Sequence, residues 1–472
     1  MSRPTEVTWG ALVCSLVLSG CAIPKKGGFT EVAALVEARA GQRVEWLQGA
    51  AEEAQVKQAV QALLAKQLSV DETVQIALLT NRSLQARYEE LGLAQADLVQ
   101  AGLLSNPVFR GSGRFSNRSS AVNTEFGVVQ DFLNILLRPA RKSLASADFE
   151  QAKFRVADAV LQLAAETKKT FYTLQGSVQT TEMLRVVAQA AQRAYEFALR
   201  QHQAGNINNL DLIAQQGLFE SAKVELVISE AAVLADRERL TRLMGLWGMD
   251  TQWRISELLP DLPEQEVPLE HLESLAISQR LDLAAERWEV ETLAKALKIT
   301  VRWRYVPLID VGVDIEKDTD GERVTGPNLT IQLPIFDQGQ AKAARVEALL
   351  RGRQQRMASL AIEIRSEVRD ARNRLRASRE LAEHYRRVLI PLRERLVAES
   401  QRFYNYMLLG VYQLLQAKQD EIGAYRGSIE ALRDYWVARS DLERAAGGEL
   451  SIEEAIANPG VGSASAAAPK LD

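Results

Sequence analysis

The chain carries the same sequence pattern twice, and this duplication restricts the possible folds more than any other feature. Residues 68–88 resemble residues 269–288 in their order of apolar, acidic and arginine positions. Each stretch opens a predicted helix of about 35 residues, which ends before Pro107 in one copy and before Pro307 in the other, because proline disfavours a helical residue before it. The two prolines lie 200 positions apart. The sequence therefore predicts two related halves rather than one globule.

Strand patterns follow both prolines. In the second copy, residues 308–316 and 327–336 are apolar at every other position, which is the period of a strand with one apolar and one polar face. A turn-rich loop joins them, so a β-hairpin is predicted at about 308–336. In the first copy a hairpin is predicted at about 108–132. Its second strand, 122–132, alternates clearly, whereas the first strand is rich in Gly and Ser.

A very long helix and a shorter return helix follow the first hairpin. They are predicted at about 141–204 and 210–246, on either side of Gly205 and a run of asparagines. The long helix has a heptad seam, which predicts helices packed in a left-handed supercoil. An ordinary two-stranded coiled coil is the alternative. The seam residues are Val160, Leu163, Thr167, Thr170, Leu174, Ser177, Thr181, Leu184, Ala188, Ala191, Tyr195 and Ala198.

The second copy repeats this arrangement. Its long helix is predicted at about 340–406 and its return helix at 411–446, with a break near Gly410. The two structural repeats accordingly span 68–268 and 269–446.

The helix lengths match only when the two repeats are combined. At about 1.5 Å per residue the first long helix measures roughly 96 Å, but its return helix measures only about 55 Å. The helix at about 270–303 supplies the missing length, and the helix at about 69–104 does so for the second copy. We therefore expect a pseudo-twofold arrangement, with the non-helical residues 248–268 as a joint. Residues 21–67 form an N-terminal segment outside the duplication, and the tail at 447–472 is expected to be disordered.

The N-terminus reads as an export signal. Arg3 precedes a short apolar run at 9–18, which is too short to span a bilayer, and the run ends in Leu-Ser-Gly-Cys21. This ending resembles the lipobox of bacterial lipoproteins. It predicts a signal peptide at 1–20 and lipidation of Cys21, and Ala22 favours the outer membrane. A plain secretory signal is the alternative.

Two hairpins supply four strands, which are too few to close a barrel. An open sheet edge is not tolerated in lipid, so the strands must be pooled between chains. Two chains would give 8 strands with a filled interior, whereas three give 12 and leave a lumen, so we expect a homotrimer. Asp310, Asp314 and Glu316 would line that lumen, and an acidic lining favours cations. The alternative is that these residues form a solvated strand face.

Composition excludes several other functions. With 57 basic and 61 acidic residues the chain has no basic surplus for nucleic acid. Cys14 lies in the predicted signal peptide, so the mature chain keeps one cysteine and no disulfide. His202, His271 and His384 are scattered without the spacing of metal ligands, and no nucleophile or phosphate-loop motif occurs. We therefore expect no catalysis, no cofactor and no bound metal. The predicted class is mainly α with a small β part.

Four short motifs connect this organisation to a known family. The corner after the second hairpin reads Pro334-Ile-Phe-Asp-Gln-Gly339. The helical reversals read Gly205 followed by Asp211-Leu-Ile-Ala-Gln215, and Tyr404-Asn-Tyr-Met-Leu-Leu-Gly410 followed by Leu414-Leu-Gln-Ala-Lys418. The final helix contains Ile429-Glu-Ala-Leu-Arg-Asp-Tyr-Trp436. Their order, with the duplication and the lipobox, resembles the TolC-type outer-membrane efflux family over nearly the whole mature chain.

This resemblance implies an outer-membrane factor lipoprotein, with its helical part in the periplasm. It would be the passive export duct of a tripartite efflux system and would dock to a periplasmic adaptor and an inner-membrane pump. The final helix resembles members of a heavy-metal branch, so metal ions or small toxic molecules are the implied cargo. Gly205 and Gly410 would permit the sharp reversals, and the leucines would either contact the adaptor or lock the hairpin core. The implied tip residues are Gly205, Leu210, Asp211, Leu212, Gly410, Leu414 and Leu415.

Two other functions fit parts of the sequence. One is the outer-membrane component of type I protein secretion, which the sequence does not distinguish from small-molecule efflux. The other is a lipid-anchored periplasmic coiled-coil scaffold without a pore. The scaffold explains the helices and Cys21, but not the alternating strands at corresponding places in both repeats.

Overall fold

A computed structural model describes residues 24–115, 122–266, 270–306, 309–317 and 320–450. Cys21, the predicted signal peptide and the tail beyond 450 lie outside the described residues. The chain forms two compact units, each assembled from separate stretches of sequence. Unit 1 contains the described parts of 1–32, 88–156 and 282–359, and unit 2 contains those of 33–87, 157–281 and 360–472.

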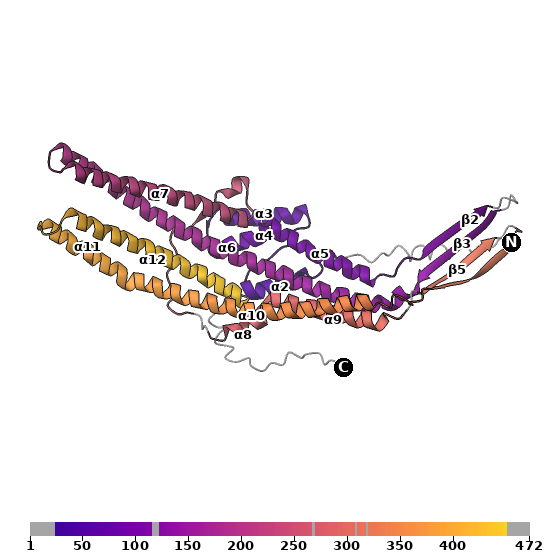
Figure 1. Cartoon of the computed structure of the whole chain (residues 1–472). Coiled ribbons are helices and arrows are strands. Elements are labelled where there is room, and N and C mark those ends of the chain that lie inside the picture. Colours follow the sequence, from indigo (N-terminus) through magenta and orange to yellow (C-terminus); the bar gives the residue numbers. More distant parts are fainter. Residues whose placement is uncertain (1–23, 116–121, 267–269, 307–308, 318–319, 451–472) are drawn as a thin grey trace. The chain divides into compact units, whose positions relative to one another are not determined.

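Unit 1 contains a four-stranded antiparallel sheet in the order β2-β3-β5-β6 (Figure 1). The strands are β2 (Val108–Phe115), β3 (Val122–Asp131), β5 (Ile309–Lys317) and β6 (Arg323–Ile331). The mainly α class with a small β part is therefore confirmed. The last strand was placed too late by the sequence pattern, which predicts 327–336. The strand ends at Ile331. The backbone then turns around Pro334, which has no N–H for a strand ladder, and Ile335 N donates to Leu333 O (2.9 Å).

Helices leave this sheet within unit 1. Helix α6 (Phe132–Gln203) follows β3 directly, because the Asp131 carboxylate accepts from Asn134 N at 2.9 Å and caps the helix. It therefore begins earlier than the predicted residue 141. The first part of α6 packs beside α9 (Leu281–Trp303) through a bond from Gln151 Nε2 to Glu289 Oε2 (2.8 Å). Arg353 of α10 (Gln340–His384) pairs with the same carboxylate at 2.7 Å.

Two long helical hairpins dominate unit 2 (Figure 1). In the first, α6 turns into α7 (Asn209–Leu243), and Ser177 Oγ donates to Asp236 Oδ2 at 2.6 Å between them. In the second, α11 (Ile390–Asn405) turns into α12 (Val411–Ala446), at the predicted bounds of the return helix. All the predicted seam positions of α6 are buried or half-buried, so the heptad prediction is confirmed.

The second long helix contains an irregular turn. Helix α10 passes through a π-helical turn, Tyr385–Leu389, before α11 begins. Pro391 lies in the first turn of α11, lacks an N–H, and would clash with a carbonyl in regular α-helical geometry. The wider π turn absorbs this defect, so the helical rod continues across it.

The first repeat lacks the single helix predicted at 69–104. Instead α4 (Val70–Thr80) and α5 (Arg82–Gly102) are separated by Asn81, whose backbone is extended (φ −64°, ψ 112°). The break arises from a contact with the end of α7. Asn81 Nδ2 donates to Leu243 O (2.8 Å), and a Cβ on Gly245 (φ +65°) would lie 2.7 Å from Thr80 O. The carbonyls at the end of α7 thereby gain partners from the α4–α5 corner.

The second repeat breaks in the same way. The predicted helix at 270–303 is divided at Arg280 (φ −61°, ψ 123°) into α8 (Leu272–Gln279) and α9. Gly447 (φ +96°) ends α12, and a Cβ there would lie 3.0 Å from Gln279 C and 3.1 Å from Arg280 N. Gly245 and Gly447 lie 202 positions apart. This equivalence supports the proposed repeats at 68–268 and 269–446.

The main apolar core of unit 2 gathers around the predicted joint at 248–268. Trp253 is buried there, donates from Nε1 to Thr241 Oγ1 (3.2 Å), and carries the Arg237 guanidinium 4.0 Å from its ring centroid. Next to it β1 (Gln67–Leu68) pairs in parallel with β4 (Arg254–Ile255). Helices α2 (Phe29–Ala40) and α3 (Ala50–Leu64) come from the N-terminal segment. None of the helices in the described ranges is both long and apolar enough to cross a membrane.

Candidate functional site: the hairpin tips and the polar face of the sheet

The first hairpin tip, between α6 and α7, is built around Gly205. Its φ of +76° is in the left-handed region, which a glycine adopts without strain. Asn206 N donates to Gln201 O (2.9 Å), the six-to-one bond of a Schellman helix end. The Asn208 side chain then caps α7 by accepting from Asp211 N at 2.9 Å. The predicted role of Gly205 in the reversal agrees with this geometry.

The second hairpin tip, between α11 and α12, has the same backbone bonds but a different residue at the turn. Leu408 N donates to Phe403 O (2.9 Å), again six-to-one, and the left-handed residue is Met407 (φ 56°). Gly410 is extended (φ −78°, ψ 158°) and precedes α12 as its N-cap. The prediction that Gly410 makes the reversal is therefore wrong, because the turn closes three positions earlier, at a methionine.

A hydrogen bond joins the two tips within unit 2. Tyr412 Oη donates to Asp211 Oδ1 at 2.7 Å, across 201 positions of sequence. This bond to Asp211 raises the pKa of the Tyr412 phenol, because ionisation would remove the donated proton. Further along the hairpins, Arg426 of α12 pairs with Glu225 of α7 at 3.6 Å. Tyr412 is absent from the predicted tip residues, because sequence spacing carries no signal for a contact of this range.

The predicted tip leucines differ in exposure. Leu210 is exposed, whereas Leu212, Leu414 and Leu415 are half-buried. Leu210 is therefore available to a partner, and the other three also contribute to packing within unit 2.

In the sheet, Asp310, Asp314 and Glu316 share one face of β5. Register places Asp310 opposite Asp131 and Glu316 opposite Glu125, so the β3–β5 seam carries carboxylates from both hairpins. Directly opposed like charges destabilise a sheet unless something offsets them. Amide and guanidinium donors do so in part: Asn328 Nδ2 to Asp314 Oδ2 (2.6 Å), Asn123 Nδ2 to Glu316 Oε1 (2.7 Å) and Arg114 to Glu125 (3.3 Å).

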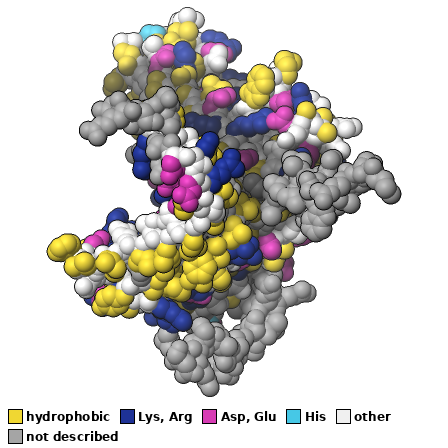
Figure 2. Space-filling model, turned by 90° about the vertical axis from the view of Figure 1, so that its right-hand side faces the viewer, with side chains coloured by type: hydrophobic (Ala, Val, Ile, Leu, Met, Phe, Trp, Pro, Cys, Tyr) yellow, Lys and Arg dark blue, Asp and Glu magenta, His cyan; other side chains and the backbone are white. Residues whose placement is uncertain are grey.

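The other face of the sheet is apolar and exposed. Large side chains on β2, β3, β5 and β6 alternate with the polar set, and Val313, for example, is 54% exposed. In Figure 2, viewed from the side on which the strands lie in Figure 1, hydrophobic side chains gather in a broad patch. The exposed apolar residues of this face are Phe109, Phe115, Phe126, Val128, Val311, Val313, Ile315, Leu329 and Ile331.

Glycines let the strands of the seam approach closely. A Cβ at Gly312 would lie 2.8 Å from Val128 O and 3.0 Å from Val129 Cγ2. A Cβ at Gly127 would lie 2.0 Å from Asp314 Oδ1, so this carboxylate lies directly over the glycine. The polar face therefore depends on side chains being absent at these two positions.

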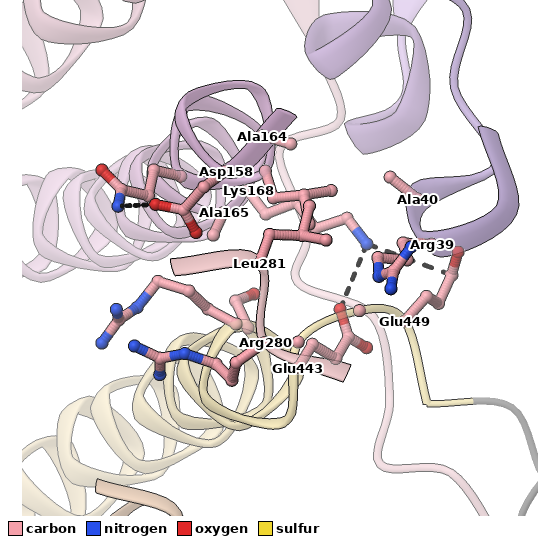
Figure 3. Close-up of a pocket in the computed structure, with 16 residues that line it drawn as sticks. Arg39, Ala40, Asp158, Ala164, Ala165, Lys168, Arg280, Leu281, Glu443 and Glu449 are labelled. Carbon is pink, nitrogen blue, oxygen red and sulfur yellow. Dashed lines mark hydrogen bonds and ion pairs between the residues drawn. The ribbon is translucent and has the colours of Figure 1, made fainter. Parts of the chain in front are cut away.

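A charged pocket of unit 2 lies at the end of α12 (Figure 3). Lys168 reaches into it and pairs with Glu443 (3.1 Å) and Glu449 (4.0 Å). Burial disfavours the Lys168 charge, but the two carboxylates outweigh this effect and raise its pKa. The pocket is small, about 50 Å³. Across the described ranges, no group of three or more His, Cys, Asp or Glu side chains is arranged to hold a metal ion.

Comparison with known proteins identifies a matching family. Residues 73–246 match the family model described as outer membrane efflux protein. This stretch covers the helices of the first repeat and its hairpin. A search of curated protein sequences finds no match.

Solved structures share the fold over most of the chain. The Campylobacter jejuni CmeC outer membrane channel is similar over 81% of this chain and 86% of its own, with a TM-score of 0.71 and 15% identity. A structure of CusC matches 80% of this chain and 92% of its own (TM-score 0.69, 15% identity). The outer membrane protein VceC from Vibrio cholerae matches 84% and 97% (TM-score 0.67, 14% identity).

Proposed function

We propose that this chain is an outer membrane efflux protein and serves as the exit duct of a tripartite efflux system; the family match of residues 73–246 and the fold shared with solved outer membrane channels support this proposal. The observation that carries this proposal is the sheet, in which β2 and β6 are edge strands and one face is apolar and exposed. An exposed apolar face is costly in water and suits a lipid surface. Unpaired edge strands are not tolerated in lipid, so β2 and β6 require partners from other copies.

Strand direction favours closure between chains. Each neighbouring pair in the sheet is antiparallel, so β2 and β6 run in opposite directions. The β6 edge of one copy can therefore pair with the β2 edge of the next in the same antiparallel pattern. Three copies close 12 strands around a lumen, whereas two leave a barrel filled by its own side chains. We propose a homotrimer on this basis.

The polar face of the sheet would then line the lumen. Asp310, Asp314 and Glu316, together with Glu125 and Asp131, would give that lining a negative charge, only partly balanced by Arg110 and Arg114 on the same face. A channel with rings of carboxylates favours cations over anions. We therefore propose cationic metal ions or small cationic toxic molecules as the preferred cargo.

The hairpin tips would dock to a periplasmic adaptor, which connects the duct to an inner-membrane pump. Cys21 would anchor the chain to the outer membrane through its lipid, and incorporation of labelled palmitate, lost in Cys21→Ala, tests that anchor. Gating would be a change in the packing of the hairpins, with the bond between Tyr412 and Asp211 holding the tips together in the closed arrangement. The duct itself needs no catalysis.

Conductance and susceptibility together test the proposed function. The protein purified from outer membranes should insert into planar bilayers as discrete channels and should pass potassium in preference to chloride. Deleting its gene should make the host more susceptible to a panel of metal cations and cationic drugs, and plasmid expression should restore resistance. Absence of channels, or unchanged susceptibility across the panel, contradicts the proposal. Loss of a secreted protein with unchanged susceptibility would favour type I secretion.

A further inference from the structure

The two hairpin tips have matching backbones, displaced by 202 positions in sequence. Gln201, Asn206 and Asn208 of the first tip correspond to Phe403, Leu408 and Gly410 of the second. The six-to-one hydrogen bonds measure 2.9 Å in both tips, and the N-caps of α7 and α12 fall at corresponding residues. The tips therefore provide a comparison in which the backbone is constant and the side chains vary.

The side chains at the two tips differ in chemistry. The first tip presents Gly205 and polar asparagines, among them Asn206, at its turn, and its exposed leucine, Leu210, lies beyond the turn in α7. The second presents Tyr406, Met407 and Leu408, which are 68%, 95% and 70% exposed. No charged residue lies between Arg402 and Lys418. The second tip is thus an uncharged apolar knob, defined by residues 406–408, on a turn that needs no apolar residue for its backbone.

The knob contains a strained residue. Met407 has a φ of 56°, and it is one of only two non-glycine residues with positive φ in the part of the chain that the structure describes. A left-handed conformation is unfavourable for a residue with a Cβ, whereas the corresponding Gly205 adopts it without strain. A side chain that is 95% exposed gains nothing from burial within the chain to offset this cost. Strain retained at an exposed apolar position points to a contact outside the chain.

We propose that Met407 and Leu408 are the apolar anchor of adaptor docking, so that the second hairpin rather than the first makes the hydrophobic part of the contact. The partner is an adaptor whose docking end is uncharged and forms an apolar pocket for these two side chains. This inference rests on the proposed function and deepens it. A few buried side chains at the centre of a contact supply most of the energy of many protein interfaces.

Two other occupants fit less well. The first tip of a second copy would offer Asn206 and its neighbouring asparagines, which would leave the knob against amides. A lipid surface would bury only two or three side chains, and even a whole acyl chain by itself gives only marginal membrane binding. The bond between Tyr412 and Asp211 also fixes the start of α12 against the first hairpin, so the knob is held in place before the partner arrives.

The test variant copies the first tip onto the second. Met407→Gly with Leu408→Asn reproduces the Gly205-Asn206 pair, which already supports the same turn, so the variant should fold and should lose the backbone strain. We expect unchanged channel conductance in planar bilayers. Resistance of the host should fall at least about tenfold, because the variant removes two apolar side chains from the centre of the docking contact. Asn206→Ala, at the position that corresponds to Leu408, is the matched control and should retain resistance.

Site-specific photo-cross-linking in the native host identifies the contact. A benzophenone amino acid at position 408 should cross-link to one periplasmic protein, at an uncharged apolar pocket, whereas the same probe at 206 should give little product. A product between two copies of this chain, a lipid product, or equal yields from 408 and 206 overturns the docking inference. If gene deletion lowers resistance but the double variant does not, only the docking inference fails. If deletion itself has no effect, the proposed function fails.

Discussion

Tyr412 Oη donates a 2.7 Å hydrogen bond to Asp211 Oδ1, and this contact ties the first turn of α12 to the first turn of α7. The two residues belong to different hairpins, so their bond opposes any outward movement of one hairpin tip from the other. In a trimer the same bond would occur three times around the periplasmic end of the duct.

Tyr412→Phe and Asp211→Asn should each loosen the tips. The first removes the donated proton and the second weakens the acceptor, so both should raise single-channel conductance and admit large antibiotics that the closed duct excludes. The double variant should be no more open than the more open single variant, because both changes break the same bond. Tyr425→Phe is the control, since its phenol bonds to Glu394 within one hairpin. Additive effects in the double variant would show that the two residues act separately.

The β3–β5 seam should be intolerant of a methyl group at Gly312. A Cβ there would meet Val128 O at 2.8 Å, and backbone cannot move away cheaply, so Gly312→Ala should cost about 1–3 kcal/mol of stability. Gly326→Ala is the matched control on the same sheet face, because nothing lies within 4 Å of that position. The fraction of protein recovered as heat-modifiable oligomer from outer membranes should fall for Gly312→Ala alone.

The corner between α4 and α5 should depend on Gly245. Gly245 and Gly248 both have a φ of +65°, so alanine costs about 1–2 kcal/mol of backbone strain at either position. Only Gly245→Ala also places a Cβ 2.7 Å from Thr80 O, whereas Gly248 has open space around it. Thermal unfolding followed by circular dichroism should therefore show the larger loss of Tm in Gly245→Ala. Equal losses would mean that strain alone matters and that the corner is not tightly packed.

Asp148 on α6 should destabilise unit 1 at neutral pH. Burial raises the pKa of its carboxyl, Glu289 and Asp97 add to the effect, and Arg155 opposes it. A raised pKa means that the folded state binds more protons than the unfolded state, so stability falls as pH rises from the ordinary value through the raised one. Asp148→Asn should therefore be more stable than the natural chain at pH 7, and the difference should vanish in acid. A variant that is less stable at pH 7 would contradict this assignment.

Periodicity predicts much of this fold. The heptad seam of α6 and the alternation at 309–315 follow from local spacing alone. In the structure the seam residues are buried or half-buried, and the polar and apolar residues of β5 lie on opposite faces of the sheet, as the sequence predicts. Periodicity does not predict the helix breaks at Asn81 and Arg280, because helix-forming residues continue on both sides of each break. Each break is set by the glycine-capped end of a helix more than 160 positions away.

The candidate site is predicted less completely than the fold. Gly205 fits its predicted role, but the sequence assigns the second reversal to Gly410, because glycine is the usual left-handed residue. Met407 takes the left-handed conformation instead. Aligning the second turn with the first by its length places Met407 at the position of Gly205, and this alignment is the sequence signal that could have identified it. Tyr412 gives no such signal, since its partner Asp211 is distant in sequence.

Disulfide cross-linking of the sheet edges tests the central claim, closure of a barrel by three copies, most directly. Cysteine at Ser112 on β2, combined with cysteine at Gly326, Asn328 or Thr330 on β6, should join chains in at least one combination. The account predicts covalent dimers and trimers and nothing larger. The control pair, Glu125→Cys with Glu316→Cys on directly paired strands, should close only within one chain. If no β2–β6 pair joins chains, or if open-ended ladders form, the barrel is not closed by three copies.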